Sequence, residues 1–202
     1  MKRIALGVLL STLLGTAQAG MLTINDGSNM SFAGYNGEPK TVTGPQSNGS
    51  FGSLSATSAG TFYVTYLGQE SGYNNFFTLA TAGSLLESDL LGKTISAEVA
   101  PGTVNFSFTD SMGAAFVNGA AQSSALGFSI FSQNTSTQYG TFDYILGFND
   151  SYRSDADYDD FVVGVKFVAA PVPEAETYSM MLAGMGLLGF VAGRRKDKEK
   201  KS

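Results

Sequence analysis

Hydrophobic and polar positions alternate along several short stretches, which is typical of a strand with one buried face. Residues 103–109 read Thr-Val-Asn-Phe-Ser-Phe-Thr, so that Val104, Phe106 and Phe108 share one face. The same alternation favours strands at 61–67, 94–99 and 161–167, and we also expect short strands at 21–24, 126–131 and 139–146. Short strands separated by Gly, Pro and Asn turns predict an all-β body, an antiparallel β-sandwich of the jelly-roll kind.

Two stretches break this pattern. Residues 20–60 are rich in Gly, Ser, Thr and Asn, so we expect mainly loops there, with one or two edge strands. Residues 84–91 read Ser-Leu-Leu-Glu-Ser-Asp-Leu-Leu, which suits a short helical turn. Neither stretch changes the predicted fold class.

The N-terminal segment has the three parts of a secretory signal peptide. A basic start at 1–3 is followed by an apolar run at 4–14 and by an A-x-A cleavage box formed by Ala17 and Ala19. We therefore expect a signal peptide over 1–19. Residues 20–170 would then form the exported body, which is long enough for one domain with a real core.

Residues 171–202 also fall into three parts. A box with Val172, Pro173 and Glu174 precedes an uncharged apolar run, and six of the last nine residues are Lys or Arg. As a helix, the apolar run 177–193 would measure about 25 Å, near the short limit for a membrane span. Basic residues flanking such a helix stay in the cytoplasm, so the pattern predicts an inner-membrane anchor with the tail 194–202 inside the cell.

This arrangement resembles the PEP-CTERM sorting domain of exported bacterial proteins. Val172, Pro173 and Glu174 match the box of that family, although Ala175 stands where the family has a second proline. The basic cluster that ends the motif is formed by Arg194, Arg195 and Lys196. The resemblance implies that an exosortase, a membrane protease, cuts near the box. It also implies that the body passes to the cell surface or to extracellular polysaccharide in a biofilm.

Composition excludes several chemistries. The chain has no Cys, His or Trp, which rules out disulfides, thiol nucleophiles, Ser-His-Asp triads and the usual zinc sites. Between Gly20 and Ala170, four basic residues stand against thirteen acidic ones, a net charge of −9. Nucleic acid and anionic membrane surfaces are therefore not expected as partners.

Five aspartates gather just before the last predicted strand, and their spacing is a candidate for Ca²⁺ binding. Carboxylates that alternate along an irregular loop can converge on one hard cation. The stretch is not an EF-hand, because Asp160 stands where that loop needs Gly and Lys166 where it needs Glu. The alternative is a solvated turn whose carboxylates cap backbone N–H groups. The candidate ligands are Asp150, Asp155, Asp157, Asp159 and Asp160.

These features favour an exported, exosortase-processed and non-enzymatic protein of the cell surface or extracellular matrix. A second interpretation is a Ca²⁺-dependent adhesin that stacks glycans on exposed aromatics. The candidates are whichever of Tyr63, Tyr73, Tyr139, Tyr152 and Tyr158 are exposed, and the alternative is that most of these are core or sheet-surface residues. A third is a glycan hydrolase working with carboxylates alone, for which the candidates are Glu70, Glu98 and Asp110.

Overall fold

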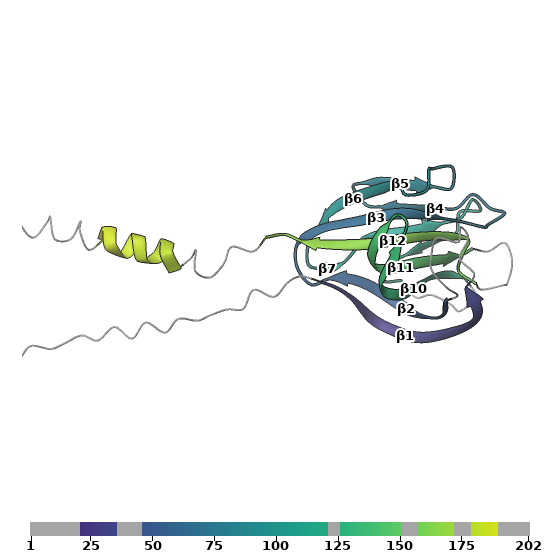
Figure 1. Cartoon of the computed structure of the whole chain (residues 1–202), viewed down its shortest axis with the longest axis horizontal. Helices are drawn as coiled ribbons and strands as arrows, with labels where there is room; N and C mark the ends of the chain where they lie inside the picture. The colour runs from purple at the N-terminus through teal and green to yellow at the C-terminus, as the bar shows by residue number, and fades with distance from the viewer. Residues whose placement is uncertain (1–20, 36–45, 121–125, 151–156, 172–178, 190–202) are drawn as a thin grey trace, which may run out of the picture. The chain divides into compact units, whose positions relative to one another are not determined.

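The computed structural model describes residues 21–35, 46–120, 126–150, 157–171 and 179–189. Residues Ala19–Ala170 form one compact unit that contains all the described strands. Figure 1 shows these strands and the separate helix at 179–189. The predicted signal peptide with Ala17 and Ala19 lies outside the described residues, as does the box with Val172, Pro173 and Glu174. Arg194, Arg195 and Lys196 lie outside them too.

The strands form two sheets, and every described strand pair is antiparallel. The larger sheet has the order β1 (Leu22–Tyr35), β2 (Gln46–Ala56), β10 (Gly127–Thr137), β11 (Gly140–Asn149), β12 (Phe161–Ala169), β3 (Gly60–Gly68) and β6 (Thr94–Val99), with β7 (Gly102–Thr103) on β2. The smaller sheet has the order β5 (Gly83–Leu86), β4 (Phe76–Leu79), β8 (Phe106–Thr109) and β9 (Ala115–Val117). The all-β, antiparallel prediction is confirmed, while the jelly-roll sandwich stays a prediction.

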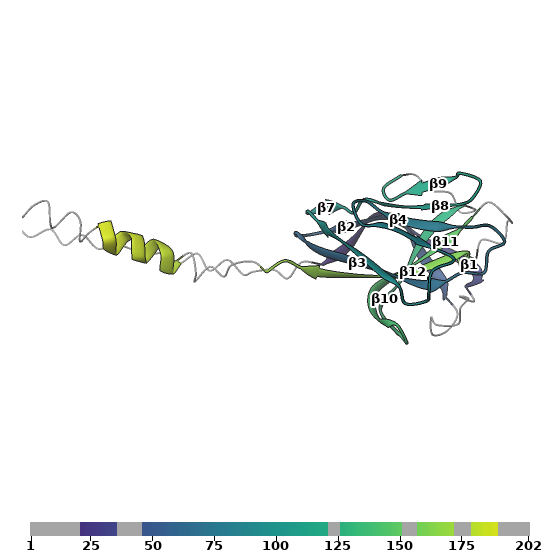
Figure 2. The same ribbon diagram turned by 90° about the horizontal axis from the view of Figure 1, so that it is seen from above.

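The main hydrophobic core joins the two sheets, and Figure 2 shows the smaller sheet as a second layer over the larger one. Val104, Phe106 and Phe108 are all buried, as their alternation predicted. The ring of Phe108 stacks on Phe148 of β11 at 5.1 Å between centroids. Because β8 and β11 belong to different sheets, such ring contacts bind the layers together.

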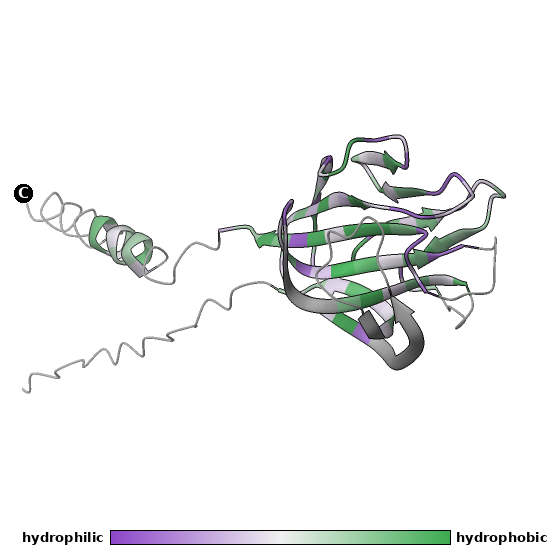
Figure 3. Cartoon of the chain, turned by 45° about the vertical axis from the view of Figure 1, so that its right-hand side comes forward, coloured by the Kyte–Doolittle hydropathy of each residue, from purple (hydrophilic) through white to green (hydrophobic). Residues whose placement is uncertain are grey.

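A second, smaller core lies on the other face of the larger sheet. Val163 of β12 belongs to the main core, whereas its neighbour Val162 belongs to the second one. Successive side chains of a strand point to opposite faces, so β12 is buried on both sides. Hydrophobic positions accordingly recur along the strands of the body (Figure 3). The buried members of the second core are Leu67, Phe131, Phe142, Ile145, Tyr158 and Val162.

The structure differs from the predicted pattern in three places. β1 and β2 are long strands in a region expected to be mainly loops, because each supplies the backbone partners of the other despite their polar sequence. Residues 84–91 begin with strand β5 rather than a helical turn, because β5 pairs with β4. The strand expected at 103–109 divides, and its two parts, β7 and β8, join different sheets.

Residues 179–189 form the described helix, which Figure 3 shows to be largely hydrophobic. Its large apolar side chains are exposed, with Met180 at 76% and Leu188 at 71%. The predicted membrane helix 177–193 continues past the described residues at both ends. Within the described part of the chain, no helix is both long enough and apolar enough to cross a membrane.

Candidate metal centre beside the β3–β12 strand pair

The antiparallel pairing of β3 with β12 brings together two acidic segments that lie far apart in sequence. Gly68 at the end of β3 pairs with Val162 near the start of β12. The residues that follow β3 therefore lie beside those that precede β12. The Glu70 N–H donates a hydrogen bond to the Asp159 carbonyl oxygen at 3.2 Å, which continues the strand contact beyond the sheet.

Tyr158 fixes the backbone between two of the predicted aspartates. Its side chain is fully buried in the second core, where its ring lies 6.0 Å from Phe51 and 6.2 Å from Phe131. Its φ of 62° is in the left-handed region, which a bulky residue seldom adopts without strong tertiary constraint. Burial of the ring provides that constraint, so the carboxylates on either side of Tyr158 hold defined positions.

Three carboxylates converge at this point: Glu70, Asp157 and Asp159. One carboxylate oxygen from each lies within 4.8 Å of the others. Glu70 is exposed, Asp157 is half-buried and Asp159 is only 1% exposed, so the cluster runs from the surface into the protein. The Asp159 Oδ1 atom is buried and has no hydrogen-bond partner among the described residues. A proton or a cation would suit this group chemically, since each removes negative charge.

The surroundings of Asp159 disfavour its charged form. Burial raises the pKa of Asp159 well above its ordinary value, and the negative charges of Asp157, Glu70 and Asp160 raise it further. The side-chain contact with Asp157 acts in the same direction. The Asp159 carboxyl group therefore keeps its proton to a higher pH than an exposed aspartate does.

Of the other aspartates predicted as ligands, Asp150 and Asp160 are not part of this three-carboxylate cluster. Asp150 is buried and its Oδ2 accepts hydrogen bonds from the Ser71 hydroxyl and, at 2.8 Å, from the Asn75 side-chain amide. The Asp160 Oδ2 accepts the Asp150 backbone N–H at 2.7 Å. These bonds tie Asp150 to the loop that follows β3, and they tie Asp160, after 151–156, to Asp150. Asp155 lies outside the described residues.

Glu70 was not among the metal ligands expected from sequence, where it figured only as a hydrolase carboxylate. Nothing local distinguishes it, because it is one acid in a Gly- and Ser-rich loop. The signal is the pairing of the strand before Glu70 with the strand after the aspartates. That pairing cannot be read from either segment alone.

The tyrosines proposed as stacking platforms also divide. Tyr158 is fully buried in the second core, so it is not one of the exposed aromatics available for stacking. Tyr63, Tyr73 and Tyr139 are half-buried, and Tyr139 packs against the second core. Tyr152 lies outside the described residues.

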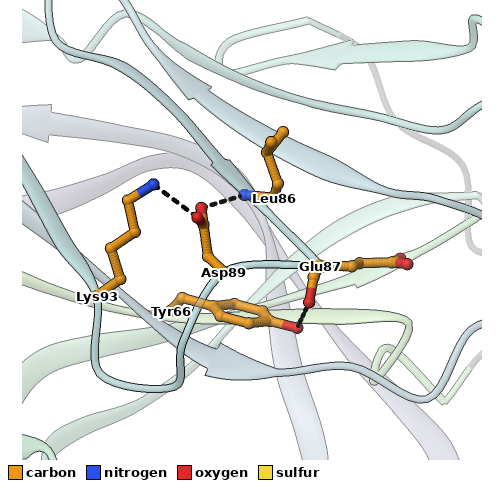
Figure 4. A network of polar contacts seen from close by, with 5 residues as sticks. All are labelled: Tyr66, Leu86, Glu87, Asp89 and Lys93. Atoms are coloured by element: carbon orange, nitrogen blue, oxygen red, sulfur yellow. Dashed lines mark hydrogen bonds and ion pairs between the residues drawn. The ribbon is translucent and has the colours of Figure 1, made fainter.

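A second acidic group lies in the turn after β5 (Figure 4). The Asp89 side chain accepts the Leu86 backbone N–H at 2.8 Å and pairs with Lys93 at 2.7 Å. The Tyr66 hydroxyl donates to the Glu87 carbonyl oxygen at 3.5 Å. The Glu87 carboxylate in turn accepts the Asn75 backbone N–H at 2.7 Å. This network fixes the turn against β3 and connects it to the loop that carries Glu70.

We expect Glu87 to make the stability of the folded body depend on pH. Burial raises the pKa of Glu87 to about 7 from an ordinary 4.5. The negative charge of Asp150 also raises this pKa, whereas the hydrogen bonds from Asn75 lower it. The folded state therefore binds more protons than the unfolded state between these pH values, so stability falls as pH rises. We expect the melting temperature of the wild type, relative to Glu87→Gln, to fall from pH 4.5 to 7 and then to level off. If the difference in melting temperature between the wild type and Glu87→Gln stayed constant over this range, the raised pKa of Glu87 would be contradicted. The control is Glu98→Gln on the exposed face of β6.

Comparison with known proteins identifies the C-terminal segment. Residues 171–196 match the PEP-CTERM protein-sorting motif. The matched range includes Val172, Pro173 and Glu174 as well as the basic cluster at 194–196. The chain is thus an exported protein with an all-β body. It carries a PEP-CTERM sorting signal, which directs it to an exosortase and toward the cell surface. No curated protein and no solved structure matches the chain.

Proposed function

We propose that the protein is a non-enzymatic component of the cell surface or extracellular matrix, released to that place by an exosortase. The observation that carries this proposal is the sorting motif at 171–196, which directly follows the compact unit Ala19–Ala170. A body that ends where the sorting signal begins can leave the membrane without losing part of its fold. The acidic, Ser- and Thr-rich body would suit a hydrated polysaccharide matrix such as that of a biofilm.

Membrane retention before cleavage is part of the proposal. The exposed apolar side chains of the helix 179–189 support membrane retention, because transfer of apolar side chains from water to lipid is favourable. The uncharged sequence runs from 177 to 193, and the basic tail 194–202 would stay in the cytoplasm. Together with a signal peptide at 1–19, this gives an inner-membrane intermediate from which the body is cut.

The carboxylates considered for a glycan hydrolase have other roles, which supports a non-enzymatic body. The Asp110 side chain is buried and accepts the Met112 and Ala114 backbone N–H groups, both at 2.9 Å. Glu98 accepts the Thr61 hydroxyl at 2.7 Å on an exposed strand. A glycosidase needs two carboxylates about 5–10 Å apart across a cleft. The third candidate, Glu70, belongs to the cluster with Asp157 and Asp159, in which one oxygen of each carboxylate lies within 4.8 Å of the others.

A second candidate is a Ca²⁺-dependent glycan-binding module. It is favoured by the position of Tyr73, a partly exposed aromatic in the same loop as Glu70. The Tyr73 backbone N–H binds the Ser71 hydroxyl at 2.9 Å, which holds this loop in shape beside the carboxylate cluster. Glycan-array binding that disappears with chelator would support this function. Binding that is absent under both conditions would favour the structural role.

The sorting proposal predicts that the box formed by Val172, Pro173 and Glu174 is needed for release of the body. Replacing Pro173 and Glu174 together with alanine should stop removal of the tail, because the protease would lose the segment it recognises. The full-length chain should then accumulate in the membrane fraction and the released body should fall to background, as measured by immunoblot. Glu176→Ala, which changes a neighbouring carboxylate outside the box, should leave release unchanged. Normal release of the double variant would contradict the proposal.

A further inference from the structure

We propose that Glu70, Asp157 and Asp159 bind one divalent cation, Ca²⁺ in preference to others, and that this ion fastens the segment before β12 to the loop after β3. The inference goes beyond the proposed sorting and surface role, because it concerns residues of the body alone. It also replaces the five-aspartate set expected from sequence with a set drawn from two segments.

The spacing of the carboxylates suits a single ion. Ca²⁺ holds oxygen ligands at about 2.3–2.6 Å, so two ligands on opposite sides of the ion lie roughly 4.6–5.2 Å apart. Ligands at right angles to each other lie closer than this. All three carboxylate oxygens lie within 4.8 Å of one another, a spacing in the range that ligands of one bound ion span.

A second observation points to a ligand at this cluster. Asp159 is 1% exposed, and its buried Oδ1 atom has no hydrogen-bond partner among the described residues. Buried polar atoms in proteins nearly always have a partner, and a buried carboxylate needs one most. Among the described residues, the charged side chains that act on Asp159 are those of Asp157, Glu70 and Asp160, which are all acidic. A bound cation would satisfy the orphaned oxygen and remove the mutual repulsion.

The ligand chemistry selects the ion. The set consists of oxygens only, and the chain contains no His or Cys to favour zinc or copper. Ca²⁺ accepts six to eight oxygens in flexible geometry, so water can complete the shell on the exposed side at Glu70. Mg²⁺ needs a near-ideal octahedron at shorter distances, which an irregular loop provides less readily. Extracellular modules bind Ca²⁺ with Kd values of about 10⁻⁴–10⁻³ M, which suits an exported protein.

The bound ion would have a mechanical consequence. Glu70 and Asp159 are already joined by one backbone hydrogen bond at 3.2 Å, next to the last backbone pair of β3 and β12. An ion held by side chains from both segments adds a second link at the same place. It would stabilise the folded state in proportion to the logarithm of the Ca²⁺ concentration above Kd.

The test uses the full-length chain in mild detergent, stripped of metal with chelator and titrated with Ca²⁺. Calorimetry should give one site per chain, and the melting temperature should rise with Ca²⁺ concentration. Glu70→Gln removes an exposed ligand without affecting the core and should weaken binding by at least about tenfold. Asp159→Asn keeps the shape of the buried group without its charge. It should fold as well as the wild type in chelator and lose the Ca²⁺ response.

The matched control is Glu98→Gln, an exposed carboxylate of the same sheet outside the cluster, which should bind Ca²⁺ as the wild type does. The proposal is overturned if the wild type shows neither heat nor a melting shift at about 10 mM Ca²⁺, well above the Kd of extracellular modules. It is also overturned if Glu70→Gln and Asp159→Asn both respond like the wild type. An equal response to Mg²⁺ and Ca²⁺ would overturn the preference for Ca²⁺.

Discussion

Replacing Gly147 with alanine should destabilise the folded protein by about 3 kcal/mol, at the upper end of the usual cost of overpacking. A Cβ atom at Gly147 would overlap the Tyr158 carbonyl oxygen and would lie 2.7 Å from the Phe131 ring. The overlapped atom belongs to the backbone, and the Tyr158 ring is locked in the second core, so neither can move cheaply. The loss should appear as a lower midpoint in chemical denaturation.

The same substitution should also weaken Ca²⁺ binding, because Tyr158 sets the positions of Asp157 and Asp159. Gly184→Ala is the control, since a Cβ there meets open space and should leave the body unchanged. If Gly147→Ala lost less than about 1 kcal/mol, the close approach of Tyr158 to β11 would be wrong.

Replacing Phe108 with alanine should be the most damaging change in the main core, with an expected loss of about 3–5 kcal/mol. Its ring contacts other aromatic rings of both sheets, with centroid distances from 5.0 to 6.3 Å. Domains of this size are stable by only about 5–15 kcal/mol, so the variant would be close to unfolding at room temperature. The rings in contact with Phe108 are those of Phe77, Phe106, Phe128, Phe148 and Phe161.

Denaturant unfolding of Phe108→Ala beside Phe116→Ala measures this effect. Phe116 is only partly buried at the border of the same core, where its ring lies 5.5 Å from that of Phe148. It should therefore lose clearly less stability than Phe108. Equal losses at the two positions would contradict a core that is centred on Phe108.

The strands that could be predicted are those whose burial follows from their own sequence. Residues 161–167 alternate apolar side chains, and both Phe161 and Val163 lie in the main core. β1 and β2 could not be predicted with the same ease, because their polar residues carry no alternation. Their strand conformation depends on the partner that each provides for the other. The break between β7 and β8 was equally hidden, since it arises from a change of sheet and not of sequence pattern.

Some residues of the candidate site could likewise be predicted from local sequence, and others could not. The density of aspartates before β12 indicated Asp157 and Asp159, because charge spacing is a local property. Glu70 became visible only through the register of β3 with β12, which is a long-range property. Asp150 resembled a ligand in sequence but is engaged by Ser71 and Asn75 from the loop after β3. The sorting motif could be recognised without tertiary structure, because the match rests on the sequence of residues 171–196 alone.

The most direct test of exosortase sorting is the intact mass and location of the protein in its native host, with and without the exosortase. We predict a body that lacks the signal peptide and the tail from about the Pro173–Glu174 box onward. It should be found outside the inner membrane only when the protease is present. A chain that keeps its tail in the inner membrane of both strains would contradict this account and leave an anchored periplasmic domain.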